Sequence, residues 1–200
     1  MRLIRPMQTC DAGWTAERHA MLMPNSIFAA FGPGFLARVY LELARSPHAV
    51  AFVHDGDRRP CGVIAALTDR RAFLVGLLAH SGAALAWAAI RGWVAHSSCR
   101  RLLLHIPRYL RRVPGLAAAE LLFITVSPEC RREGVARALI ARTLDEFRAR
   151  RIARAVVSIE TSNTAIAGIL ERFGFRRIDR FVFADKWNDV LAMNLEGAGT

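Results

Sequence analysis

One stretch decides the fold of this chain: residues 119–144, AELLFITVSPECRREGVARALIARTL. Its first part, residues 121–126, is apolar and rich in β-branched side chains, which predicts a buried strand. The strand is expected to end at Ser127-Pro128, because proline has no N–H to donate to a sheet. From residue 136 onward, apolar side chains recur at helical spacing and predict a helix with one apolar face. The stretch therefore indicates a strand, a loop and a helix in succession.

The loop between this strand and this helix has the composition of an anion-binding site. It reads Arg131-Arg132-Glu133-Gly134-Val135-Ala136. The first N–H groups of a helix lack partners within the helix, and the helix dipole favours a negative charge there. Gly134 allows the backbone to approach a ligand closely, and the arginines add positive charge. We therefore expect this loop to bind a phosphate group.

The length and composition indicate one globular domain. The chain has 200 residues, 53% of them hydrophobic, which suffices for one full core and excludes a disordered protein. We expect a single domain over residues 1–195 and a frayed tail over 196–200. The net charge of +11 has two open interpretations: a compositional bias towards arginine, or a surface that favours phosphate-bearing molecules, anionic lipid or nucleic acid as partners. Arginine is spread along the chain without interleaved aromatic residues, which argues against nucleic acid.

The cysteines and histidines form no metal-binding pattern. The four cysteines are scattered without a CxxC pair, which is typical of reduced thiols in a cytoplasmic protein. The six histidines form neither an HxxxH nor an HExxH pattern. Residues 1–14 contain no apolar segment of a secretory signal. We therefore expect no bound metal and a cytoplasmic location, with membrane association as the alternative.

Short apolar runs and helical stripes alternate along the rest of the chain. Residues 1–7 predict a short strand, and after two helices residues 49–54 and 61–67 predict a β-hairpin around the turn DGDRRP. After residues 119–144, the sequence predicts a strand at 155–160, a helix at 163–173 and a C-terminal hairpin. This order predicts an α/β fold with one sheet.

Residues 68–117 interrupt this pattern with an insert of helical character. Within it, residues 72–90 carry no charge, and residues 100–112 are basic and amphipathic. The uncharged run is long enough to span a bilayer, but its Ala and Gly content and its place inside the domain favour a packed helix. Three interpretations stay open: a packed insert, a peripheral membrane contact through residues 72–112, and a membrane span.

The motifs, taken in order, resemble those of the GNAT acetyltransferase superfamily. The pattern Arg131-x-x-Gly134-x-Ala136 is similar to its pyrophosphate loop, and the place between a strand and a helix agrees. Asn163, followed eleven residues later by Gly174-Phe175, is similar to its Asn-helix-Gly-Phe ending. The resemblance covers roughly residues 118–175. It implies an α+β mixed sheet of the acyl-CoA N-acyltransferase type, with splayed fourth and fifth strands and the helical insert between the third and fourth strands.

The resemblance also implies how acetyl-CoA binds. The pantetheine arm would pair like an extra strand with the main chain of residues 124–126, and the pyrophosphate would lie on the amides of residues 131–136. Asn163 would contact the cofactor arm, although an N-cap role explains it equally well. Glu133 places a negative charge in a loop that would otherwise be basic. Its carboxylate weakens binding of the pyrophosphate unless it points to solvent. The predicted cofactor-binding residues are Ile124, Thr125, Val126, Arg131, Arg132, Glu133, Gly134, Val135, Ala136, Arg137 and Asn163.

Two carboxylates are candidates for the general base that takes a proton from the attacking amine. Glu120 stands eleven residues before Arg131, the spacing at which histone-type members of the superfamily carry their base. Glu160 lies two residues beyond Ser158, where ribosomal-protein acetyltransferases of the superfamily carry theirs, so it shares that strand face. The alternative for Glu120 is a plain exposed residue at the start of a strand.

The usual general acid is missing. The superfamily often places a tyrosine seven residues after the helix-start asparagine, where this chain has Leu170. The only tyrosines are Tyr40 and Tyr109, and nothing in the sequence brings either to the site. The leaving thiolate, whose thiol has a pKa of about 8.5, can take its proton from water, so a general acid is not essential.

The functional expectation is an acetyl-CoA-dependent N-acetyltransferase whose acceptor, the amine of a small molecule or peptide, attacks the thioester directly. Two alternatives stay open. One is a catalytically weak acyl-CoA-binding regulatory module, which Leu170 and Glu133 favour. The other is a membrane or nucleic-acid adaptor with an inherited fold. The apolar and basic insert predicts an acceptor that is apolar, membrane-associated or anionic.

Overall fold

The protein, seen in a computed structural model, is described over residues 3–24, 26, 28–56, 59–95, 119–183 and 185–195. The second part of the insert, which includes Tyr109, and the tail over 196–200 lie outside the described residues. The elements are β1 (Ile4–Pro6), α1 (Ala12–Leu22), α2 (Pro33–Arg45), β2 (Ala49–Asp55), β3 (Pro60–Leu67), α3 (Arg70–Ala95), β4 (Ala119–Val126), α5 (Val135–Ala149), β5 (Arg154–Glu160), α6 (Thr164–Arg172), β6 (Arg176–Phe183) and β7 (Lys186–Asn194).

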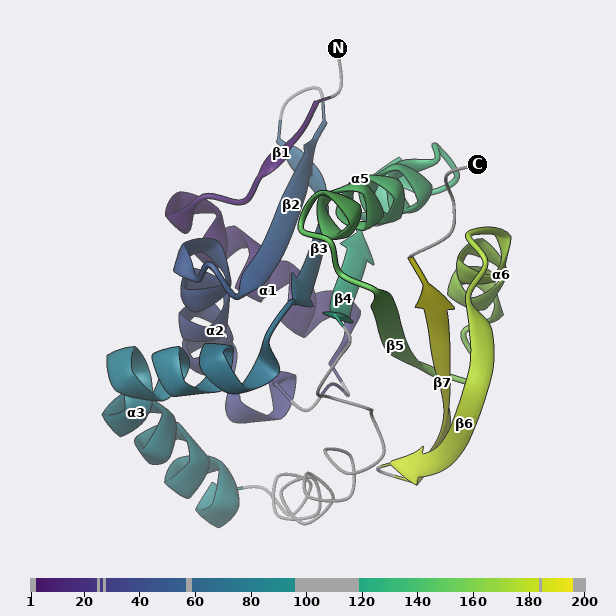
Figure 1. Cartoon of the computed structure of the whole chain (residues 1–200). Coiled ribbons are helices and arrows are strands. Elements are labelled where there is room, and N and C mark those ends of the chain that lie inside the picture. The colour runs from purple at the N-terminus through teal and green to yellow at the C-terminus, as the bar shows by residue number, and fades with distance from the viewer. Residues whose placement is uncertain are drawn as a thin grey trace.

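The strands form one seven-stranded mixed sheet in the order β1-β2-β3-β4-β5-β7-β6 (Figure 1). The two hairpins expected from the sequence, β2–β3 and β6–β7, are both antiparallel neighbours. Only β4 and β5 run parallel within the described sheet, because α5 carries the chain back between them. The predicted mixed α/β fold is confirmed.

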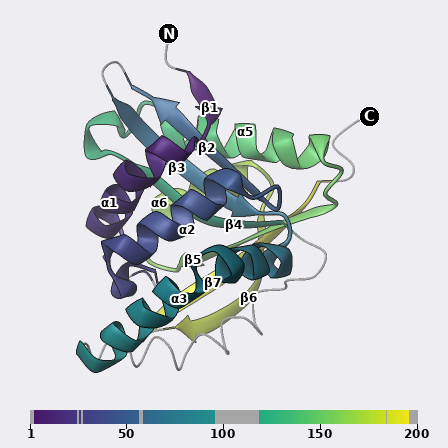
Figure 2. The same ribbon diagram turned by 90° about the vertical axis from the view of Figure 1, so that its left-hand side faces the viewer.

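The two largest apolar cores lie on opposite faces of the sheet. On one face the stripe of α5, with Leu139, Ile140 and Leu144, packs together with Leu170 of α6 against β3, β4 and β5. On the other face α1, α2 and α3 pack over β2 and β3, and the ring of Phe123 joins this core from β4. Figures 1 and 2 show how the two groups of helices flank the sheet. Residues on adjacent positions of one strand therefore meet different helices.

The described part of the insert is a single long helix, α3, that packs on α2. Phe73, Leu77 and Leu85 are buried in the core shared with α1 and α2. Gly76 permits this contact, because a Cβ there would lie 2.8 Å from Oε1 of Glu42 on α2. The insert thus begins as a packed helix on the α1–α2 face, between β3 and β4 in sequence.

Candidate active site

The strands β4 and β5 separate soon after they pair. Their parallel register covers three pairs, from Ala119–Ala155 to Leu121–Val157. Beyond this point β4 stays paired with β3 up to Val126, and β5 stays paired with β7 up to Glu160. The main-chain groups of β4 that point away from β3 therefore face the gap. An extended ligand can form sheet-like hydrogen bonds with such an edge.

A β-bulge in β4 lies where the gap opens. Ala65 and Ala66 of β3 oppose Phe123 and Leu121, so Leu122 is the extra residue. As a consequence Leu122 and Phe123 both pack into the core under α1 and α2, while Ile124 and Val126 return to the α5 side. Bulges commonly re-aim side chains beside functional sites. Here the bulge sets which face each side chain of residues 124–126 meets.

The loop after β4 curls into the first turn of α5. Its start is fixed by the N–H of Ser127, which donates to the carbonyl of Cys61 on β3 (2.8 Å). Arg132 and Gly134 have φ of +64° and +79°. The helical ladder begins with the N–H of Ala138 donating to Gly134 (2.9 Å), so the preceding N–H groups of the first turn point out of the helix end. Left-handed turns of this kind make anion-binding concavities.

The side chains of this loop are accessible to a ligand. Residues 131–134 and Arg137 are exposed, whereas Val135 is buried against the sheet. The site combines amides at a helix start with three arginines in one short segment, which is the chemistry of a phosphate site. Glu133 is exposed as well, and its effect on pyrophosphate binding stays a prediction.

Asn163 occupies the N-cap of α6. Its Oδ1 accepts a hydrogen bond from the N–H of Ile166 (3.4 Å), and the residue is exposed. The capping role expected from the chemistry of asparagine is therefore present. A ligand contact at this position remains a prediction.

Glu120 is a buried residue with an arginine partner. Only 4% of its side chain is exposed, and its Oε2 accepts hydrogen bonds from Nε of Arg70 (2.8 Å) and from Nη2 of the same guanidinium. Arg70 is the first residue of α3. Glu120 lies opposite Val156 of β5, one residue before the gap opens. The insert helix thus reaches the carboxylate that the sequence proposes as the base.

Glu160 lies at the far end of β5, where the gap is open. Both of its carboxylate oxygens accept hydrogen bonds from Nζ of Lys186 on β7, at 2.7 and 2.9 Å. Its side chain is 40% exposed. Glu160, Ser158 and Val156 alternate along β5 and share the sheet face of Glu120. The two candidate bases thus occupy one face, at the closed and open ends of the gap.

A buried polar chain lies on this same face and was not found from the sequence. Nδ1 of His19 lies 2.8 Å from the hydroxyl of Tyr40, and Nε2 lies 2.6 Å from Oγ of Ser26. The ring of His19 also packs on Phe123 of β4, with centroids 4.6 Å apart. Burial lowers the pKa of the His19 imidazole to about 4, so the ring is neutral at neutral pH.

Aromatic side chains extend this cluster towards the segment between α1 and α2. Phe28 meets Phe123 edge to face at 5.2 Å, and Phe31 packs on Phe35 at 4.8 Å. Phe28, Phe31 and Phe35 are half-buried. An apolar wall therefore borders the β4 side of this face.

Leu170 fills the position at which the resemblance places a general acid. It is 1% exposed and belongs to the core between α5, α6 and the sheet. Tyr40 is also fully buried, on the opposite face. Burial raises the pKa of the Tyr40 phenol well above its usual value.

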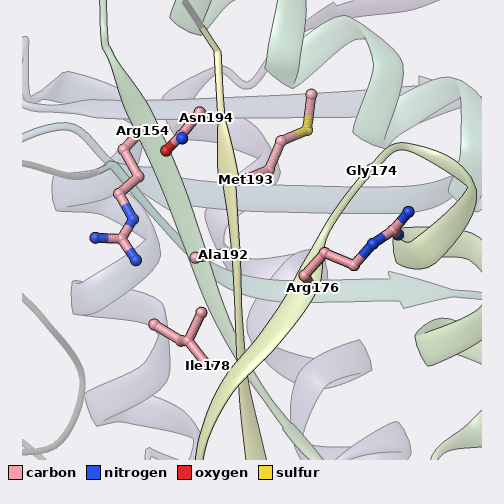
Figure 3. A pocket seen from close by; sticks show the side chains of 7 residues that line it. All are labelled: Arg154, Gly174, Arg176, Ile178, Ala192, Met193 and Asn194. Atoms are coloured by element: carbon pink, nitrogen blue, oxygen red, sulfur yellow. The ribbon is translucent and has the colours of Figure 1, made fainter.

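A shallow hollow lies elsewhere, among the first residues of β5 and β6 and the last residues of β7 (Figure 3). It lies at the end of the sheet where β5 begins, whereas the gap opens towards the ends of β4 and β5. In Figure 3 the side chains of Arg154 and Arg176 point to opposite sides of the hollow. The geometry therefore favours the gap as the site.

Two further findings concern metals and membranes. Within the described ranges, no three or more His, Cys, Asp or Glu side chains gather where they could hold a metal ion. Of the helices in the same part of the chain, none has the length and apolar character needed to cross a bilayer.

A model of the acetyltransferase (GNAT) family matches residues 23–175, and the chain belongs to this family. Its members transfer acyl groups to amines. Among curated protein sequences, none is similar enough to count as a match.

Solved structures of several N-acetyltransferases share the fold. An N-acetyltransferase from Staphylococcus aureus is 15% identical, with a TM-score of 0.63 over 98% of this chain and 99% of its own. Arabidopsis thaliana NAA60, solved in complex with acetyl-CoA, is 12% identical, with a TM-score of 0.63 over 98% and 100%. The Escherichia coli ribosomal-protein-S18-alanine N-acetyltransferase is 15% identical, with a TM-score of 0.56 over 100% and 97%. At these identities the likeness shows the fold alone.

Proposed function

We propose that the protein is an acetyl-CoA-dependent N-acetyltransferase that acetylates the amine of a small molecule or peptide. The observation that carries this proposal is the gap between β4 and β5, with the exposed loop of residues 131–134 at its end. The gap offers an unpaired strand edge, and the loop offers amides and arginines. These two features suit an acyl donor with an extended arm and a pyrophosphate. Acetyl-CoA supplies an activated acetyl thioester.

In this proposal, each part of the site holds one part of the donor. The main chain of Ile124, Thr125 and Val126 pairs with the pantetheine arm, and the amides of residues 131–136 hold the pyrophosphate. Arg131, Arg132 and Arg137 add charge, and Asn163 reaches the arm from the start of α6. The exposed surface of this loop and helix supports these assignments.

The acceptor nitrogen attacks the thioester carbon, a C–N bond forms, and the C–S bond breaks. Glu120 acts as the general base, directly or through water, and takes the proton that the nitrogen loses. Its place beside the start of the gap supports this role. Its ion pair with Arg70 orients the carboxylate, but the guanidinium also competes with the acceptor amine for the same oxygen. The thiolate is protonated by water, because Leu170 offers no proton.

Glu160 is the alternative base. Its greater exposure and its place at the open end of the gap favour access to an acceptor. A cation competes with the acceptor amine here as well, because Nζ of Lys186 donates hydrogen bonds to both oxygens of Glu160. The choice between the two carboxylates is therefore an experimental one.

Two measurements test the proposed function. Calorimetry should detect binding of acetyl-CoA to the intact protein, and release of free thiol should depend on an amine from a panel of polyamines, amino acids and short peptides. Glu120→Gln should lower kcat by roughly 10²- to 10⁴-fold without weakening acetyl-CoA binding. Unchanged turnover in Glu120→Gln together with a loss in Glu160→Gln would transfer the role to Glu160.

A second candidate function is an acyl-CoA-binding regulatory module without efficient transfer. The buried pair of Glu120 with Arg70 and the core packing of Leu170 favour it. It predicts tight acetyl-CoA binding with no thiol release on any amine of the panel. Amine-dependent thiol release rejects this candidate.

A peripheral membrane contact through α3 is part of the proposal for the acceptor side. Val75, Leu78, Trp87 and Ile90 are 56–68% exposed on this helix, and the chain carries a net charge of +11. Apolar side chains on a basic protein suit the surface of an anionic bilayer. Co-sedimentation with phosphatidylserine-containing vesicles should decrease when these four residues are changed to serine. Equal and negligible binding of both proteins rejects the membrane contact.

A further inference from the structure

Gly62 is an unusual residue for its place in the sheet. It lies inside β3, between β2 and β4, and pairs with His54 on one side and Val126 on the other. Glycine weakens the interior of a strand, and its presence often marks the close approach of another element. In this protein the element that approaches is the first turn of α5.

The contact leaves no room for a side chain. A Cβ on Gly62 would lie 2.7 Å from Cγ1 of Val135 and 3.1 Å from Cδ1 of Leu139. The first distance is shorter than carbon atoms tolerate. Val135 is the first residue of α5 and is 2% exposed. A β-branched side chain in a helix has one strongly preferred rotamer, so Val135 cannot rotate away easily.

The same end of β3 also holds the beginning of the loop. The carbonyl of Cys61 accepts the hydrogen bond from Ser127, the first residue after β4. Two neighbouring residues of β3 thus position the two ends of the loop. Cys61 holds its start through the hydrogen bond from Ser127, and Gly62 lets its end lie close to the sheet because it has no side chain. Because β3 is held on both edges by other strands, a larger residue at position 62 displaces the helix start rather than the strand.

We infer that Gly62 is a positioning residue for the acyl donor: it lets α5 lie close enough to the sheet for the amides of residues 131–136 to reach the pyrophosphate. This inference rests on the proposed function. Gly62 itself lies beneath Val135 and acts through the position of the helix. Sites built from helix-start amides depend on the exact position of the helix. In enzymes, a shift of about 1 Å in a positioning group can lower the reaction rate on the order of 100-fold.

The test compares CoA affinities by calorimetry. Gly62→Ala should raise the Kd for CoA at least about tenfold, a change of about 1.4 kcal/mol. The double variant Gly62→Ala with Val135→Ala removes the Cγ1 methyl group that clashes. It keeps the main-chain amide of residue 135, which is the only part of Val135 proposed to bind the donor, and should restore the Kd to within about threefold of wild type, about 0.7 kcal/mol. Gly82→Ala, in α3, is the matched control because a Cβ there has nothing within 4 Å. Its CoA affinity should equal that of wild type.

The outcomes separate the inference from the proposed function. Failure of the wild-type protein to bind CoA contradicts the proposed function. Wild-type binding together with an unchanged Kd in Gly62→Ala, or with no recovery in a folded double variant, overturns the role of Gly62 alone. If Gly62→Ala does not fold, the folded double variant decides: wild-type affinity supports the inference and lost affinity overturns it.

Discussion

The two faces of the sheet border the gap with different chemistry. On the α5 face the site consists of backbone: a strand edge, helix-start amides and a loop with two left-handed residues. On the face of α1, α2 and α3 lie interacting side chains: the Arg70–Glu120 pair, the fully buried His19–Tyr40 contact and a wall of phenylalanines. Backbone recognition suits a donor that never varies. In the proposed function, the α5 face forms the donor side of the site and the face of α1, α2 and α3 forms the acceptor side.

The largest expected effect concerns the pair that joins the insert to β4. Arg70→Met leaves the buried carboxylate of Glu120 without this partner, and should lower the free energy of unfolding by about 3–5 kcal/mol. Urea unfolding followed by circular dichroism measures the loss. Arg71→Met is the matched control, because Arg71 is the exposed neighbour in the same helix. Equal stability of the two variants contradicts a structural role for the pair.

The next effect concerns the donor side alone. Gly134 has a φ of +79°, a conformation in which a β-branched residue is strongly strained. Gly134→Val should therefore distort the loop and raise the Kd for CoA by about 100-fold. Gly13→Val, at an exposed site in α1 with no neighbour within 4 Å of its Cβ, should leave the Kd unchanged. Equal affinities of the two variants would remove the loop from the donor site.

The smallest effect concerns the buried His19 and is a pH dependence. The pKa of His19 falls from 6.5 to about 4 on burial, so the unfolded chain binds the extra proton first as the pH drops. Stability from this residue is therefore lost progressively as the pH falls from 6.5 to about 4. His19→Gln should flatten the stability profile over this window. A variant profile parallel to that of wild type contradicts the prediction.

The same comparison explains which parts the sequence could predict. The strand at 121–126, the helix after it and the N-cap at Asn163 follow from local patterns of apolar spacing, proline and capping residues. The phosphate-type loop follows from its position between these elements. Because all of these signals lie within a few residues of one another, the elements that carry the proposed donor side could be predicted from the sequence.

The acceptor side could not be predicted in this way. Arg70 and Glu120 are 50 residues apart, and His19 and Tyr40 are 21 residues apart. An ion pair between distant elements leaves no periodic pattern, because it depends on how α3 and α1 pack on the sheet. The role inferred for Gly62 could not be predicted for the same reason, because Val135 lies against it only in the folded protein.

The most direct test is a crystal structure of the intact protein with CoA. We predict that the pyrophosphate lies within hydrogen-bond distance of the amides of residues 131–136. We also predict that the pantetheine arm pairs with the main chain of Ile124, Thr125 and Val126. A CoA molecule bound elsewhere, for example in the hollow beside Arg154 and Arg176, with the gap between β4 and β5 unoccupied, would contradict the central claim.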